Sequence, residues 1–124
     1  MNVQNLNSFA RFWTLGYRRL CPVTPPQCPL SERSSLHRRM KSGRPEDDAR
    51  GKAPGVKWPD GTWSGFDFVK HESTEADLER WHDMGAGVGV KTGLQPDGTT
   101  LLMIDADHLR EINALRVDEA TIKA

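Results

Sequence analysis

The 124-residue chain is predicted to fold as an α+β protein, with a mixed sheet that carries helices packed on one face. Two observations favour this class. The periodic segments run in the order helix, strand, long loop, helix, strand, strand, helix, without an internal repeat. The length is also sufficient for one modest core. We therefore expect a single domain over residues 1–124.

The first element is predicted to be an amphipathic helix over Asn5–Leu15. Leu6, Phe9 and Trp13 recur there at helical spacing, and Gly16 follows as a stop signal.

A strand and a long basic loop are predicted next. The sequence YRRLCPVTPP, residues 17–26, indicates a strand that its prolines end. The two cysteines, Cys21 and Cys28, are expected to be unlinked thiols. Residues 27–60 are rich in Ser, Arg, Gly and Pro and show little periodicity, so we expect an irregular basic loop. The net charge is zero, but residues 1–57 hold eleven Lys or Arg against four Asp or Glu, while residues 58–124 hold six against thirteen. This asymmetry fits either two solvated faces or a basic segment for phosphates beside an acidic one for metal.

A turn and a capped helix follow. Pro-Asp-Gly indicates a tight turn between Trp58 and Trp63. Thr74 with Asp77 three residues later is typical of a capping box, and Gly85 is a suitable residue just past the helix end.

The remaining segments predict two strands and a final helix. VGVKTG reads as a short strand, LQPDGTT as a turn, Leu101–Ile104 as a buried strand, and the residues from His108 onward as a helix. No stop signal follows this last helix, so the domain is expected to be incomplete.

Three alternating glycines, Gly85, Gly87 and Gly89, do not form a dinucleotide-binding loop. That fingerprint requires a strand before the glycines and a helix after them, and the order here is reversed. Two explanations remain: a helix cap leading into a strand, or a strand that a nucleotide or nucleic-acid backbone can approach closely.

Two carboxylates, Asp105 and Asp107, follow the last apolar strand. On a strand both would project to the same face, where like charges repel unless a cation compensates them. Mg²⁺ or Mn²⁺ would suit such a pair and leave room for substrate phosphates. Alternatively, Asp107 caps the helix that begins at His108, and Asp105 is a solvated residue at the strand end.

Taken in order, these pieces resemble the N-terminal domain of bifunctional DNA primase–polymerases, within the archaeo-eukaryotic primase superfamily. The matching pieces are FARFWTLGYRRLCPVTPP, the G-K-x-P element GKAP, the turn GTWSG, a helix with Trp81 near its end, GVGVKTG, and LLMIDAD. Together they cover nearly the whole chain.

The resemblance implies an RRM-like catalytic core, here partial, that performs metal-dependent nucleotidyl transfer in DNA replication of a phage, plasmid or similar element. Asp105 and Asp107 match the catalytic, metal-binding carboxylates, and Mg²⁺ or Mn²⁺ is the implied cofactor. Lys52, together with Arg50 and Lys91, is a candidate for nucleotide or phosphate binding, although Lys52 also fits a solvated loop lysine. The implied partners are DNA template and primer, nucleoside triphosphates and a helicase domain or protein.

The chain departs from the family after Asp107. The family continues with a histidine-bearing nucleotide motif and a third acidic ligand, and the seventeen residues that follow here show neither. Enzymatic activity of this chain by itself is therefore left open. The alternatives are a non-catalytic nucleic-acid-binding fragment or accessory replication protein, and, less favoured, a D-x-D phosphohydrolase, which usually carries its pair after the first strand. With no membrane-length apolar run and no signal-like N-terminus, we expect a cytoplasmic protein.

Overall fold

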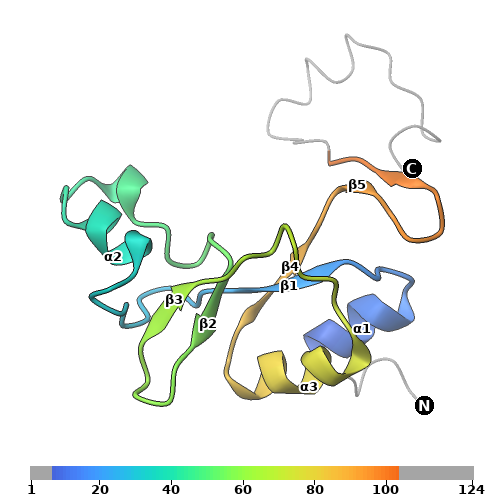
Figure 1. Cartoon of the computed structure of the whole chain (residues 1–124), viewed down its shortest axis with the longest axis horizontal. Helices are drawn as coiled ribbons and strands as arrows, with labels where there is room; N and C mark the ends of the chain where they lie inside the picture. Colours follow the sequence, from blue (N-terminus) through green and yellow to red (C-terminus); the bar gives the residue numbers. More distant parts are fainter. Residues whose placement is uncertain (1–6, 104–124) are drawn as a thin grey trace, which may run out of the picture. The chain divides into compact units, whose positions relative to one another are not determined.

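The computed structural model describes residues 7–103 of the chain (Figure 1). These residues belong to two compact units, one up to Lys91 and one from Thr92 onward, and each is described by itself. The first unit contains, in order, α1 (Ser8–Thr14), β1 (Leu20–Val23), α2 (Ser35–Met40), the 3-10 turn η2 (Pro45–Asp47), β2 (Gly55–Lys57), β3 (Trp63–Gly65), α3 (Glu75–Asp83) and β4 (Gly87–Val90). The second contains β5 (Gly93–Leu94) and β6 (Thr100–Leu101).

The protein is α+β, as predicted, but its sheets differ from the expected one. Three two-stranded antiparallel sheets form: β1 with β4, β2 with β3, and β5 with β6. Within residues 7–103 no two named strands pair in parallel, and the single parallel contact is an isolated bridge between Leu30 and Trp63. The mixed sheet is therefore not found in this part of the chain.

Capping hydrogen bonds determine where the two longer helices, α1 and α3, begin and end. The Asn7 side chain accepts a hydrogen bond from Ala10 N at 2.8 Å and caps α1, so the helix starts three residues later than the sequence predicted. At its other end Gly16, with φ of 109°, and the N–H of Tyr17 satisfy the last carbonyls. The predicted stop at Gly16 is confirmed.

Helix α3 confirms its predicted capping box and end. The Asp77 carboxylate accepts from the backbone N–H of Thr74 at 2.9 Å. Gly85 has φ of 86° and donates to His82 O, while Ala86 N donates to Trp81 O. This pair of bonds is a Schellman motif, which favours glycine because the left-handed conformation is strained for other residues.

Helices α1 and α3 cover one face of the β1–β4 pair (Figure 1). Their core consists of Phe9, Leu20, Leu78 and Trp81, all buried, with Val88 and Val90 of β4 packed against them. The ring centroids of Phe9 and Trp81 lie 5.6 Å apart. Buried aromatic area of this kind supplies much of the stability of a small domain.

Residues 27–60, expected as an irregular loop, instead contain α2, η2 and β2. The Ser34 side chain accepts from Leu36 N at 3.1 Å and starts α2. Leu36 then packs with Ala49 and Trp63 into a second buried cluster. A helix this short is too brief for periodicity to reveal it.

Thr24, directly after β1, connects the β1 segment to the turn of residues 51–54 that precedes β2. Its N–H donates to Ala53 O at 2.9 Å, and its hydroxyl oxygen accepts from Gly51 N at 3.1 Å. A bridge between Val23 and Pro54 continues this contact toward β2.

The sequence PDGT occurs twice, at residues 59–62 and 96–99, and forms the turn of a hairpin each time. Between β2 and β3, Gly61 N donates to Trp58 O at 2.9 Å and Trp58 N donates to Thr62 O at 2.7 Å. Between β5 and β6, Gly98 and Gln95 repeat both bonds, with Thr99 in place of Thr62. Each glycine has positive φ, and both predicted turns are confirmed.

The second unit corrects one expectation. The sequence favoured a buried strand over Leu101–Ile104, but β6 ends at Leu101, and Leu102 and Met103 are 58% and 81% exposed. Ile104 lies outside the described residues.

Candidate functional site

The predicted metal ligands Asp105 and Asp107 lie outside the described residues. Their role as carboxylate ligands stays a prediction, and so does the alternative that Asp107 caps a helix. Carboxylate oxygens are ligands of the type that Mg²⁺ and Mn²⁺ prefer. Within residues 7–103, no three His, Cys, Asp or Glu side chains are grouped to hold a metal ion.

Lys52 lies on an exposed turn with a fixed backbone. Its N–H donates to Ala49 O at 3.0 Å, and Gly51 before it has φ of 80°. A Cβ on Gly51 would lie 3.3 Å from Pro26, so the turn packs closely on the prolines that end the β1 segment. The Lys52 side chain is therefore presented to solvent from a rigid base, which suits a cation that meets a phosphate.

Arg50, two residues earlier, is engaged with Asp48. Its Nε and Nη2 donate to the two Asp48 oxygens at 2.9 and 2.8 Å, and its Nη1 donates to Cys28 O at 3.3 Å. These hydrogen bonds lower the pKa of Asp48 to about 2. The charge of Arg50 is thus already compensated, and a phosphate at this residue would have to share it with Asp48.

Lys91 is buried at the end of β4, where its ammonium holds the loop before α3. Nζ donates to Phe68 O at 2.6 Å and to His71 O at 2.5 Å, and it lies 3.8 Å from Glu72 Oε1. The side chain is only 7% exposed. A phosphate would reach this ammonium only by displacing one of its carbonyl partners, so the position of Lys91 favours a structural role.

A buried carboxylate on α3 organises the same loop. Asp77 accepts from His71 Nε2 at 2.8 Å, from Thr74 N and from Arg80. Burial opposes its ionisation, but the hydrogen bonds from His71 and Thr74 prevail and lower the pKa of Asp77. The sequence identified the cap but not the contact with His71, which depends on the path of the loop.

Gly89 illustrates why β4 is rich in glycine. A Cβ at this position would lie 2.6 Å from Cys21 Sγ and 3.2 Å from Cys21 O on the neighbouring strand. Cys21 is a buried free thiol whose pKa is raised by burial. The close approach is therefore made by β1, which supports the structural explanation for Gly89, as the αL geometry does for Gly85.

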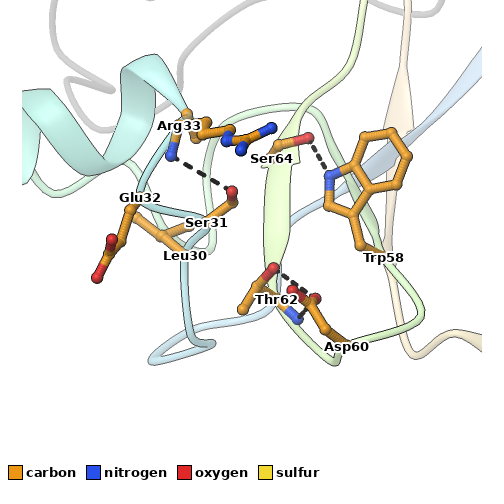
Figure 2. Close-up of a pocket in the computed structure, with 9 residues that line it drawn as sticks. Leu30, Ser31, Glu32, Arg33, Trp58, Asp60, Thr62 and Ser64 are labelled. Atoms are coloured by element: carbon orange, nitrogen blue, oxygen red, sulfur yellow. Dashed lines mark hydrogen bonds between the residues drawn. The ribbon is translucent and has the colours of Figure 1, made fainter.

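A pocket of about 820 Å³ lies between the turn before α2 and the β2–β3 hairpin (Figure 2). Its walls are joined by backbone hydrogen bonds, from Trp63 N to Pro29 O and from Ser31 N to Trp63 O, each of 2.8 Å. The residues that line it are Leu30, Ser31, Glu32, Arg33, Ser34, Trp58, Asp60, Thr62 and Ser64. The sequence did not single out this pocket, because segments almost thirty residues apart form it.

Comparison of the chain with protein-family models, with curated proteins and with solved structures gives no match. Nor does any described helix have the length and apolar character needed to cross a membrane.

Proposed function

We propose that the chain belongs to a primase–polymerase domain that carries out metal-dependent nucleotidyl transfer in DNA replication of a phage, plasmid or similar element. In this proposal the described α+β unit is part of an RRM-like core and the protein acts in the cytoplasm. One observation supports it most: four of the segments that resemble the family contact one another within the first unit.

These contacts centre on the end of β1. The G-K-x-P turn is bonded to Thr24 through Gly51 and Ala53. The GVGV strand pairs with β1 over its whole length, and the GTWSG segment pairs with β2, directly after the G-K-x-P turn. The segments that carry the resemblance therefore belong to one folded unit, as the proposed domain requires.

In the proposed reaction, Lys52 binds phosphate, and Asp105 and Asp107 bind the metal ion. A primer 3′-hydroxyl oxygen attacks the α-phosphorus of a nucleoside triphosphate, a new P–O bond forms, pyrophosphate leaves with the broken bond, and the hydroxyl proton passes to solvent. Lys52 meets the triphosphate or a template phosphate as a point charge. Asp105 and Asp107 would hold Mg²⁺ or Mn²⁺, which when bound would neutralise the charge that develops on the phosphates.

Extension of a labelled primer on a template by the purified chain tests this function. We expect incorporation that requires Mg²⁺ or Mn²⁺ and that disappears in Asp105→Asn and Asp107→Asn. Asp83→Asn, a change at an exposed position on α3, is the matched control and should retain activity. Metal-dependent release of phosphate from an aryl phosphate, without incorporation, would instead indicate the phosphohydrolase.

The second candidate is a non-catalytic nucleic-acid-binding fragment or accessory replication protein. The pocket beside Trp58 favours this non-catalytic role, because nucleic acid could bind there without Asp105 and Asp107. Binding of an oligonucleotide without nucleotide incorporation at high protein concentration would support this role over the enzymatic one.

Lys52 provides a second test of the enzymatic function. Replacing Lys52 with Gln should raise the KM for nucleoside triphosphate by roughly 10- to 100-fold, since a charged hydrogen bond contributes about 1.5–3 kcal/mol. Lys57→Gln, an exposed position on β2, is the control. Equal KM values for both variants would make Lys52 a solvated loop lysine.

A further inference from the structure

Trp58 is an unusual side chain in this protein because it combines exposure with a fixed orientation. Trp58 is 51% exposed, whereas Trp63 and Trp81 are 3% and 1% exposed. The indole Nε1 donates to Ser64 Oγ at 2.7 Å across the hairpin (Figure 2). The PDGT turn fixes its backbone at the same time. A large aromatic face is thus held open to solvent at the edge of the 820 Å³ pocket.

Arg33 supplies a positive charge on the opposite wall of this pocket. Figure 2 shows its guanidinium extending from the turn before α2 toward Ser64. Its backbone N–H is bonded to Ser31, but its guanidinium has no hydrogen bond or ion pair within residues 7–103. Further exposed cations follow on α2 and just after it: Arg38, Arg39 and Lys41. Arg44 is also exposed, but it is paired with Asp47 at 2.8 Å.

Two carboxylates restrict where an anion can bind. Glu32 and Asp60 both line the pocket. Figure 2 shows the Glu32 carboxylate pointing away from Trp58, and Asp60 Oδ1 accepts from both Thr62 N and Thr62 Oγ1, at 2.9 and 2.7 Å. These bonds lower the pKa of Asp60, which stays charged. Phosphates are therefore disfavoured beside the PDGT turn and favoured on the side of Arg33 and α2.

We propose that this pocket binds single-stranded nucleic acid, with an unpaired base stacked on Trp58 and the adjacent phosphates on Arg33 and the cations of α2. An aromatic platform beside a row of positive charges is the arrangement that binds single strands without strong sequence preference. A duplex would not offer an unstacked base to Trp58. The proposal deepens the proposed function by placing a strand-binding site, but it does not depend on the predicted metal ligands.

Titration of the full-length chain with fluorescein-labelled oligo(dT), in EDTA and at low salt, tests this site. Fluorescence anisotropy should show binding that Trp58→Ala weakens by about tenfold, the effect of losing one stacked base. Trp58→Phe keeps an aromatic face and should retain most of the affinity. Because Trp58 is half exposed, both variants should fold, which circular dichroism verifies.

The charge contribution is measured by the salt dependence of the same binding. Arg33→Gln should weaken binding and reduce the slope of log K against log salt by about 0.7, the effect of one phosphate contact on a single strand. Arg11→Gln makes the same change of charge on an exposed residue of α1 and should leave both quantities unchanged.

Three results would overturn the proposal. The first is no binding of the oligonucleotide, and the second is equal affinity of wild type and Trp58→Ala for it. The third is that wild type binds heparin as tightly as the oligonucleotide and that Arg33→Gln and Arg11→Gln lose the same oligonucleotide affinity. The last result would indicate unspecific attraction of a polyanion. Asp105→Asn and Asp107→Asn should bind the oligonucleotide as wild type does. Failure of the metal-dependent reaction is therefore distinguishable from failure of this site.

Discussion

Single residues in this protein are explained mainly by close contacts that the linear sequence conceals. Gly89 is the clearest example: the sequence left open whether a ligand or another strand approached it, and Cys21 of β1 occupies the space. The pairing register that brings Cys21 opposite Gly89 is a tertiary property, so the glycine pattern by itself could not decide between the two explanations.

Replacing Gly89 with Ala should lower the free energy of unfolding by about 1–3 kcal/mol, because the new methyl group would overlap Cys21. Gly87→Ala is the matched control, since its Cβ would make an ordinary contact of 3.7 Å with Val23. Urea unfolding of both variants measures the difference. Equal midpoints would show that β1 and β4 do not approach as closely as described.

Asp77 should make stability depend on pH. Its pKa is lowered in the folded state, so the stabilisation is present above the unfolded pKa of about 3.9 and is lost as the pH falls through the folded value. Asp77→Asn should cost about 1–3 kcal/mol at pH 7 and lose less stability than wild type between pH 7 and pH 3. Asp83→Asn, exposed on the same helix, should follow wild type in urea unfolding at both pH values. Parallel pH profiles for wild type and Asp77→Asn would contradict this role.

At the scale of elements, the sequence predicted what short-range chemistry determines. The stop of α1 at Gly16, the capping box of α3 and both PDGT turns follow from residues within five positions of one another. The short helix α2 and strand β2 escaped prediction, because their stability comes from burial of Leu36, Ala49 and Trp63 in a cluster assembled from distant segments. Tertiary contacts decide such elements more than propensity does.

The loop before α3 is predicted to depend on Lys91. Lys91→Met keeps the aliphatic stem but leaves the carbonyls of Phe68 and His71 without their ammonium partner, which should cost about 1–3 kcal/mol. Hydrogen exchange over residues 68–72 should accelerate more than in Lys70→Met, a change of an exposed lysine in the same loop. Unchanged exchange would instead leave Lys91 available for the predicted phosphate contact.

At the scale of the whole molecule, the basic residues differ in whether their charge is available to bind phosphate. Arg33 lines the pocket of Trp58, and exposed cations follow it on α2. Arg50 and Lys91, both predicted to bind phosphate, are instead committed to Asp48 and to backbone carbonyls. Of the three predicted phosphate-binding residues, Lys52 remains the one whose side chain is presented to solvent. The pocket beside Trp58 could not be predicted, because it depends on the contact between Ser31 and Trp63.

In the proposed function, Asp105 and Asp107 hold a divalent cation. Binding of Mn²⁺ to the full-length chain, followed by electron paramagnetic resonance, measures it directly. We expect wild type and Asp83→Asn to bind Mn²⁺ equally, and Asp105→Asn and Asp107→Asn each to lose binding. Undiminished Mn²⁺ binding in both of these variants would contradict the claim.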